Sequence, residues 1–318
     1  MESAAPGQRE ILSKVPAVTL TFWIIKILAT TLGETGGDTV TMTWLGETTS
    51  HANPYGYLIG TGIFAILLVA LVVIQILARR FSPWLYWATI VASTTFGTAL
   101  ADFADRSLGI GYTGGSLLLL CLLLVTLGLW YRSEGTVSVN TVSTPKVEAF
   151  YWATITFSQT LGTALGDWLA DTGGLGYEGG ALVFTAGLIA VAALNYWTRV
   201  SRVTLFWLAF ILTRPLGATV GDFLDKPVNH GGLDLSRPLA SAVIAGLIFV
   251  LLIILPQRPG QHPRGTADRP AVRAESGGSI HHPQLSEAAT FEHDASLREG
   301  GEGSHDDNPS GRSGKADG

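Results

Sequence analysis

Residues 86–102 read YWATIVASTTFGTALAD and residues 151–167 read YWATITFSQTLGTALGD. Both stretches begin with an aromatic-Trp pair, and both place a glycine ten residues and an aspartate fifteen residues after the tryptophan. The same spacing occurs four times, in Trp23/Gly33/Asp38, Trp87/Gly97/Asp102, Trp152/Gly162/Asp167 and Trp207/Gly217/Asp222. Self-similarity of this kind is typical of tandem structural repeats, so we predict one unit that is used four times.

The distance between the repeats indicates what each unit contains. Successive tryptophans are 64, 65 and 55 residues apart, which leaves room for two membrane-crossing helices and their loops. Apolar stretches occur at about 18–38, 56–78, 84–104, 114–131, 150–170, 180–197, 203–224 and 238–255. Each is close to the ~20 residues that cross a ~30 Å hydrocarbon layer. We predict an all-α integral membrane protein with eight transmembrane helices, arranged as four tandem helical hairpins.

The chain of 318 residues divides into three parts by composition. We expect a short N-terminal segment at 1–17, a membrane domain at 18–255 and a tail at 256–318. The repeats of the membrane domain lie at about 18–78, 84–131, 150–197 and 203–255. The tail is rich in Pro, Gly, Ser and charged residues, which is typical of disorder. It holds five of the seven histidines, so it is either a soluble linker or a segment that collects metal ions.

The distribution of basic residues predicts the orientation. Nine Lys and Arg residues fall on one side of the predicted membrane and three, Arg106, Lys226 and Arg237, on the other. The positive-inside rule therefore places both termini in the cytoplasm. The tryptophans of the repeats then lie near the cytoplasmic interface, where we expect an aromatic belt, and the aspartates lie toward the outer face. The first span carries a repeat motif and no cleavage site, so we expect it to be a retained helix.

Polar residues form a stripe along each odd-numbered span. Seven, eleven and fifteen residues after the tryptophans the chain carries Thr30/Glu34/Asp38, Thr94/Thr98/Asp102, Gln159/Thr163/Asp167 and Arg214/Ala218/Asp222. Positions i, i+4 and i+8 share one helix face, so each stripe runs from mid-membrane to the outer interface. Acidic residues inside apolar helices are costly in lipid, which makes them candidates for function.

Small residues form a second stripe beside the polar one. Ten and fourteen residues after the tryptophans lie Gly33/Gly37, Gly97/Ala101, Gly162/Gly166 and Gly217/Gly221. This spacing lets helix backbones approach closely in lipid. The odd-numbered helices run parallel, so packing along this seam gathers the polar stripes around a shared axis. We expect a pseudo-fourfold or a two-plus-two bundle with an acidic outer vestibule.

The gathered polar residues predict a cation site. Its candidate residues are Glu34, Asp38, Thr98, Asp102, Thr163, Asp167, Arg214 and Asp222, and its candidate metal ligands are Glu34, Asp38, Asp102, Asp167 and Asp222. Carboxylates and hydroxyls are hard ligands, suited to Mn²⁺, Mg²⁺ or Ca²⁺ and, at lower charge, to Na⁺ and protons. Alternatively, each aspartate marks the outer interface and bonds the loop backbone. Lys26 either joins Arg214 as a counter-charge or extends to the inner interface.

Local sequence suggests two irregularities in these helices. The glycines around Glu34, in Gly33-Glu34-Thr35-Gly36-Gly37-Asp38, are expected to interrupt the first span. Pro215 removes a helical hydrogen bond and is expected to kink the seventh span.

Several kinds of chemistry are disfavoured by the residues present. Cys121 is the only cysteine, which excludes a disulfide within the chain. The glycine-rich loops at 109–115 and 174–180 lack the strand-to-helix context of a phosphate loop and are interpreted as tight turns. No nucleophile–base arrangement or nucleic-acid patch stands out. We therefore expect no enzyme, no cofactor and no nucleic-acid partner.

The repeats resemble a family of uncharacterised bacterial membrane-anchored proteins that are built from a repeat of unknown function. The likeness rests on starts such as Tyr86-Trp87-Ala88-Thr89 and Tyr151-Trp152-Ala153-Thr154 and covers roughly residues 20–255. It implies an architecture and a bacterial plasma membrane, but no activity. A fainter likeness links Glu34-Thr35-Gly36-Gly37-Asp38-Thr39 to cation and manganese exporters with Glu-x-Gly-Asp-Lys/Arg-Thr/Ser, although an extra glycine is present and the basic residue is missing.

Two functions follow from these features. The first is a transporter or channel for a cation, such as divalent Mn, with lipid and an inorganic cation as partners. The second is a membrane scaffold or sensor in which the glycine seams serve assembly and the tail binds a partner. Deleting the tail distinguishes them.

Overall fold

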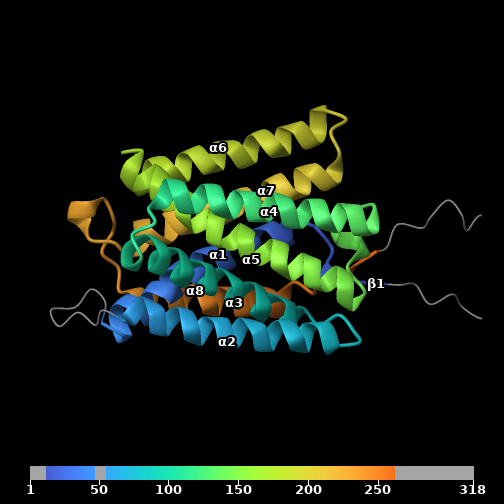
Figure 1. The fold of residues 1–318 in the computed structure, drawn as a ribbon, viewed down its shortest axis with the longest axis horizontal. Helices are drawn as coiled ribbons and strands as arrows, with labels where there is room; N and C mark the ends of the chain where they lie inside the picture. Colours follow the sequence, from blue (N-terminus) through green and yellow to red (C-terminus); the bar gives the residue numbers. More distant parts are fainter. Residues whose placement is uncertain (1–11, 47–54, 262–318) are drawn as a thin grey trace, which may run out of the picture. The chain divides into compact units, whose positions relative to one another are not determined.

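The computed structural model describes residues 12–46 and 55–261. Residues 1–266 form one compact unit, and the second unit, residues 267–318, lies outside the described residues. The predicted disordered tail is therefore described only as far as Gln261. The chain is all-α, and Figure 1 shows its long helices side by side. They are α1 (Leu20–Asp38), α2 (Gly56–Leu77), α3 (Pro83–Asp102), α4 (Tyr112–Glu134), α5 (Pro145–Asp167), α6 (Gly176–Trp197), α7 (Arg202–Asp225) and α8 (Arg237–Ile254).

The composition of these helices identifies a multi-pass membrane protein in contact with lipid. Among the described residues, α2, α4, α6, α7 and α8 are long and apolar enough to cross a membrane. The helices α1, α3 and α5 have comparable lengths but are richer in polar residues, and most of these are buried. Apolar side chains of α2, α4, α6 and α8 are instead exposed on the outside, where lipid covers them.

Each odd-numbered helix begins at a side-chain cap. A Ser or Thr hydroxyl accepts a hydrogen bond from a backbone N–H of the first turn, which replaces a missing helical partner. The capping residues are Thr19, Ser82, Thr144 and Ser201. Pro83 and Pro145 follow two of them, at a position where proline costs no helical hydrogen bond. The odd-numbered helices therefore start at positions that the local sequence defines.

The odd-numbered helices differ from the sequence-based expectation in their continuity and in how they end. The glycines around Glu34 do not interrupt α1, which runs unbroken to Asp38, because close contacts with neighbouring helices support its backbone there. After Asp38, Asp102 and Asp167 the chain continues as π-helical turns at Thr39–Trp44, Phe103–Ser107 and Trp168–Thr172. Short π-helical segments are common at functional sites. In the fourth repeat α7 stays α-helical to Asp225, with Pro215 inside it.

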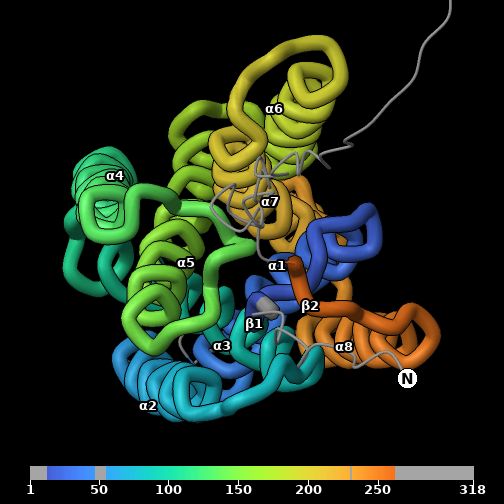
Figure 2. The backbone as a smooth tube through the Cα atoms, turned by 90° about the vertical axis from the view of Figure 1, so that its right-hand side faces the viewer, coloured from blue at the N-terminus to red at the C-terminus, as the bar shows by residue number. Residues whose placement is uncertain are grey.

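The four odd-numbered helices form a closed inner ring. α1 packs against α3, α3 against α5, α5 against α7, and α7 against α1. Figure 2, a view along the bundle, shows this ring with α2, α4, α6 and α8 outside it. The arrangement is the pseudo-fourfold one, so the polar stripes of all four repeats face one axis.

The two helices of one repeat are connected as predicted but do not pack mainly on each other. α2 packs against α3, α4 against α5, α6 against α7, and α8 returns to α1. The turn Thr39–Trp44 carries the chain past α1, and the hydroxyl of Thr61 on α2 donates to the Ala99 carbonyl of α3 at 2.9 Å. The hydroxyl of Ser241 on α8 donates to Thr35 on α1 at 3.0 Å. The second helix of each repeat therefore packs on the first helix of the next repeat around the ring.

The aromatic pairs form an internal cluster and not an exposed belt. The aromatic residue before each tryptophan packs against the tryptophan of the adjacent helix. The ring-centroid distances are 5.5 Å for Phe22–Trp87, 5.8 Å for Tyr86–Trp152, 6.3 Å for Tyr151–Trp207 and 5.6 Å for Phe206–Trp23. Trp87, Trp152 and Trp207 are at most 4% exposed. This end of the ring is therefore filled, because four large ring pairs meet where the helices converge.

A short sheet, absent from the sequence-based prediction, joins the two ends of the membrane domain. Strand β1 (Leu12–Pro16) pairs antiparallel with β2 (Pro259–Gln261) at the aromatic end of the bundle. Lys14 pairs with Glu148 at 2.6 Å and also donates to the Gln75 and Ile76 carbonyls at the end of α2. Both pieces were assigned to separate terminal segments. They lie together because α1 begins and α8 ends on the same side of the bundle.

Two short 3₁₀ helices complete the described secondary structure. Val139–Thr141 lies between α4 and α5, where Ser13 Oγ donates to the Val139 carbonyl at 2.7 Å. Val228–His230 follows α7 at the opposite end of the bundle.

Candidate functional site

Close glycine contacts hold the polar stripes together at the axis. A Cβ built on the first glycine of each repeat would overlap the residue seven positions after the tryptophan of the next repeat. The distances are 2.3 Å from Gly33 to Thr94, 3.2 Å from Gly97 to Gln159, 2.3 Å from Gly162 to Arg214 and 2.2 Å from Gly217 to Thr30. Any side chain at these glycines would push the neighbouring helix away, and the axial residues would separate.

The second small residue of each pair lies at the next level of the same seams. A Cβ on Gly37 would stand 3.0 Å from Thr98, one on Gly166 would stand 3.2 Å from Ala218, and one on Gly221 would stand 2.6 Å from Glu34. The seven glycines that the sequence singles out therefore all lie at contacts between inner helices. Small residues have this effect wherever helices approach closely.

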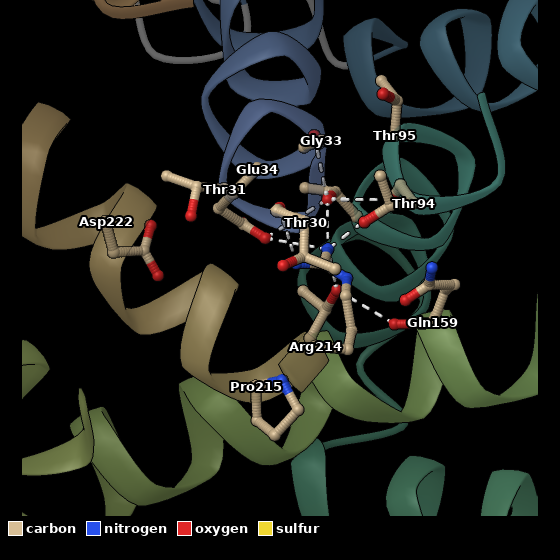
Figure 3. A network of polar contacts seen from close by, with 12 residues as sticks. Thr30, Thr31, Gly33, Glu34, Thr94, Thr95, Gln159, Arg214, Pro215 and Asp222 are labelled. Atoms are coloured by element: carbon tan, nitrogen blue, oxygen red, sulfur yellow. Dashed lines mark hydrogen bonds and ion pairs between the residues drawn. The ribbon is translucent and has the colours of Figure 1, made fainter. Parts of the chain in front are cut away.

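Arg214 lies at the centre of the ring and is completely buried. Its Nη2 donates to Glu34 Oε2 at 2.9 Å, to Thr98 Oγ1 at 2.6 Å and also to Thr163 Oγ1 (Figure 3). The three acceptors are the residues eleven positions after the tryptophans of repeats 1, 2 and 3, and the fourth equivalent is Ala218. One guanidinium thus joins four helices and is neutralised by one carboxylate, which is how a buried charge is tolerated.

Lys26 lies one level closer to the aromatic end and is also fully buried, so it does not extend to the interface. Its Nζ is 3.4 Å from Gln159 Oε1 and 4.2 Å from the centre of the Phe210 ring. No carboxylate forms an ion pair with Lys26 in the described part of the chain. A cation over an aromatic face gains an attraction that partly replaces a counter-ion.

Three of the predicted metal ligands come together on the outer side of Arg214. Oxygen atoms of Glu34, Asp38 and Asp222 lie within 4.8 Å of one another, and all three residues are buried. Asp38 Oδ1 has no hydrogen-bond partner among the described residues. Such a group of carboxylates from two neighbouring helices can supply oxygen ligands to a cation.

The other two predicted ligands lie apart from this group. Asp102 pairs with Arg106, at 2.9 Å, one helical turn further along its own chain. Asp167 is 4% exposed and forms no ion pair with a described residue. The ring of aspartates is therefore unequal, because each repeat offers different neighbours at the same level.

Lys226 forms ion pairs with two of these three carboxylates. Its Nζ lies 2.6 Å from Asp38 Oδ2 and 3.0 Å from Asp222 Oδ1. The side chain is 9% exposed. The sequence placed Lys226 among the few basic residues of the outer loops, and its tie to the axis was missed.

A pocket of about 760 Å³ opens at the aspartate end of the bundle. Lys226, which pairs with Asp38 and Asp222, forms part of its wall, whereas Glu34, Asp38 and Asp222 themselves do not line it. Its wall includes the residues nineteen positions after all four tryptophans, Met42, Arg106, Asp171 and Lys226. This level continues the i+4 stripe by one more turn, and extending the same spacing along the sequence would have found it.

Tyrosines at the starts of even-numbered helices are a second feature that sequence reasoning missed. Tyr57, Tyr112 and Tyr177 each follow a glycine at the beginning of α2, α4 and α6. They lie near Asp102, Asp167 and Asp222, the aspartates of the following repeats. The repeated Gly-Tyr pair was the available signal, and its meaning depends on the packing of each even-numbered helix onto the next repeat.

The comparison with known proteins identifies the repeat. The pattern of a family described as Repeat of Unknown Function (DUF347) matches residues 21–81, 85–136, 150–201 and 205–256. No curated protein and no solved structure matches the chain.

Proposed function

We propose that this chain, which belongs to the DUF347 repeat family, is a transporter or channel that binds a cation between its inner helices. The observation that carries the proposal is the buried group of Glu34, Asp38 and Asp222 beside a pocket at one end of the bundle. Buried acidic residues are costly in a membrane protein and are typical of ion pathways. Oxygen ligands from carboxylates favour hard cations.

The two ends of the bundle support a pathway that is open on one side. At the aspartate end the pocket reaches Lys226, and the carboxylate of Asp38 lies 2.6 Å from the Lys226 ammonium group. At the other end the aromatic cluster and strand β1 fill the ring, and Val15 of β1 is only 1% exposed. An ion bound at the carboxylates would thus be reached from the aspartate end and blocked from the aromatic end. Alternating closure of two such ends is the physical requirement for a carrier.

The membrane arrangement that fits this proposal has all eight helices crossing the bilayer. α1, α3 and α5 lie inside the ring, where they need no apolar surface toward lipid, so their polar composition is compatible with crossing. The excess of basic residues at the aromatic end supports a cytoplasmic location for that end and for both termini, in the plasma membrane of a bacterial cell. Arg106, Lys226 and Arg237 at the other end each pair with an aspartate.

The test is ion binding and flux in the purified protein, with single carboxylates neutralised. Glu34→Gln and Asp222→Asn should each weaken binding of the transported cation and its flux into liposomes, because each removes one charged ligand. Glu178→Gln is the control, since Glu178 is an exposed residue in the first turn of α6. Asp167→Asn should have a smaller effect than either ligand variant. Flux that survives both ligand substitutions would show that the pathway lies elsewhere.

A truncation separates this proposal from the scaffold alternative. A stop after Gln261 removes the tail but keeps β2 and its pairing with β1. Ion flux should be retained by the truncated protein, whereas a scaffold that works through its tail would lose its partner.

A further inference from the structure

The Lys226 ammonium group occupies the position that a bound cation would need. It lies against Asp38 Oδ2 at 2.6 Å and Asp222 Oδ1 at 3.0 Å, and these are two of the three carboxylates that converge with Glu34. A metal ion and an ammonium group compete for the same lone pairs. Any cation that binds all three carboxylates must therefore displace Lys226.

Charge balance indicates which cation could do so. Glu34, Asp38 and Asp222 carry three negative charges, and Arg214 and Lys226 together supply two positive ones. When Lys226 leaves, Arg214 remains and the group has two uncompensated negative charges. With Lys226 in place the group keeps one uncompensated negative charge, so a monovalent cation would only return the group to that state. A divalent cation would neutralise the group completely and remove the cost of the remaining buried charge.

The carboxylate of Asp225 can receive the displaced ammonium group of Lys226. Asp225, one residue before Lys226, is 3% exposed, and neither of its carboxylate oxygens has a hydrogen-bond partner among the described residues. Its closest basic group is Arg237, at 3.8 Å, which is a long ion pair. Asp225 and Lys226 both line the outer pocket. A carboxylate without donors beside the present position of Lys226 can accept the ammonium group when it moves outward.

The backbone of Lys226 is held in place, so only its side chain needs to move. Its carbonyl accepts the N–H of Asp234 at 2.9 Å, and its own N–H donates to the Asp222 carbonyl at 2.8 Å. Gly232 packs so closely that a Cβ there would lie 2.0 Å from the Lys226 carbonyl oxygen. The loop after α7 thus fixes the Cα position, while the long side chain keeps its rotatable bonds.

We infer that the ammonium group of Lys226 occupies the cation position between the carboxylates, and that a divalent cation entering from the outer pocket displaces it toward Asp225. This inference rests on the proposed function and specifies its substrate class and its gate. Lys226 offsets one charge of the empty carboxylates and raises the threshold for a cation to enter. Specificity follows, because a singly charged ion only replaces the charge of Lys226, whereas a doubly charged ion also neutralises the remaining carboxylate.

The experiment measures Mn²⁺ binding to the full-length protein in detergent, by calorimetry and by the rise in thermal unfolding temperature. Lys226→Met removes the competing charge and retains the apolar stem, so it should bind Mn²⁺ at least about tenfold more tightly than the wild type. Without Mn²⁺ it should unfold at a lower temperature, since the carboxylates lose a counter-charge. Lys146→Met is the matched control and should leave binding unchanged, because the Lys146 side chain is 64% exposed.

Asp225→Asn supplies an independent variant in case Lys226→Met does not fold. It removes the carboxylate that accepts the displaced ammonium group and should weaken Mn²⁺ binding by at least about threefold. Na⁺ at equal ionic strength should not raise the thermal unfolding temperature of any variant. If the wild type and Lys226→Met bind Mn²⁺ equally, the inference is wrong and the proposed function stands. If Lys226→Met binds more weakly, Lys226 supports the site and does not compete for it. If neither protein binds Mn²⁺, Ca²⁺ or Mg²⁺, the inference is wrong, and the proposed function fails as well if the wild type also shows no flux of Na⁺ or protons.

Discussion

Arg214 is the residue that breaks the fourfold symmetry of the ring. The equivalent residues of the other repeats are Thr30, Thr94 and Gln159, and only the fourth repeat places a charge there. This one guanidinium bonds groups from the other three inner helices. Because a buried charge is stable only with its partners, Arg214 and Glu34 depend on each other.

We expect Arg214→Gln to lower the free energy of unfolding by about 3–5 kcal/mol, because it leaves Glu34 buried without its ion-pair partner. The double variant Arg214→Gln/Glu34→Gln should lose less than the sum of the two single losses, since no uncompensated charge remains. Denaturant unfolding of the purified protein in detergent measures both. Arg80→Gln, at an exposed position, is the control. Equal stability of Arg214→Gln and Arg80→Gln would mean that the central ion pair contributes nothing.

The inner helices are joined by a glycine seam in every repeat, whereas the glycines of the outer helices range from close contact, as at Gly180, to open space. Gly162 of α5 lies against Arg214 and Pro215 of α7, where a Cβ would come within 2.3 Å of another atom. Gly128 of α4 has no atom within 4 Å of an added Cβ. The two glycines both lie inside long helices, so their substitution separates the cost of close packing from the intrinsic effect of a methyl group.

Gly162→Ala should destabilise the protein by about 1–3 kcal/mol, the usual cost of overpacking. Gly128→Ala should be neutral or slightly stabilising, because alanine favours helix and meets nothing there. Thermal unfolding in detergent compares the two. If Gly162→Ala also weakens ion binding, the seam positions Arg214 as well as the helices. Equal unfolding temperatures for the two variants would show that α5 and α7 are free to separate.

The described helices form a ring that the chain closes by pairing β1 with β2 and by packing α8 on α1. α8 packs on α1, and β2 pairs with β1, so the fourth repeat completes the first one. The same side of the bundle carries the start of α1, the end of α8 and the aromatic cluster. An even number of crossings is the topology that this closure requires.

Reporter fusions test this topology. Fusions after residues 80, 200 and 260 should report the cytoplasm, and a fusion after residue 108 should report the opposite side. The reason is that nine basic residues lie on the predicted side that holds the first three positions, against three on the other. The fusion after residue 260 also cuts β2, so its level needs a control fused after residue 318. A periplasmic signal from both would contradict an even number of spans.

Periodicity in the sequence was sufficient to predict the helices, the repeats and the residues that face the axis. Tryptophan, glycine and aspartate recur at constant spacing because each inner helix meets its neighbours in the same way, and an i+4 stripe marks a helix face wherever the helix is packed. The same reasoning did not identify Lys226 as an axial residue. Lys226 continues the spacing, but the sequence suggests a loop at its position.

Three features required the packed structure. The packing of α2 on α3 depends on the π-helical turn Thr39–Trp44, and the packing of α8 on α1 depends on the loop after α7. Helix periodicity encodes neither path. The division of the five candidate ligands into Glu34, Asp38 and Asp222 on one hand and two separate aspartates on the other depends on which basic side chain each meets. The pairing of β1 with β2 joins residues almost 250 positions apart. Local sequence determines a face, whereas contacts across the ring decide which charges neutralise one another.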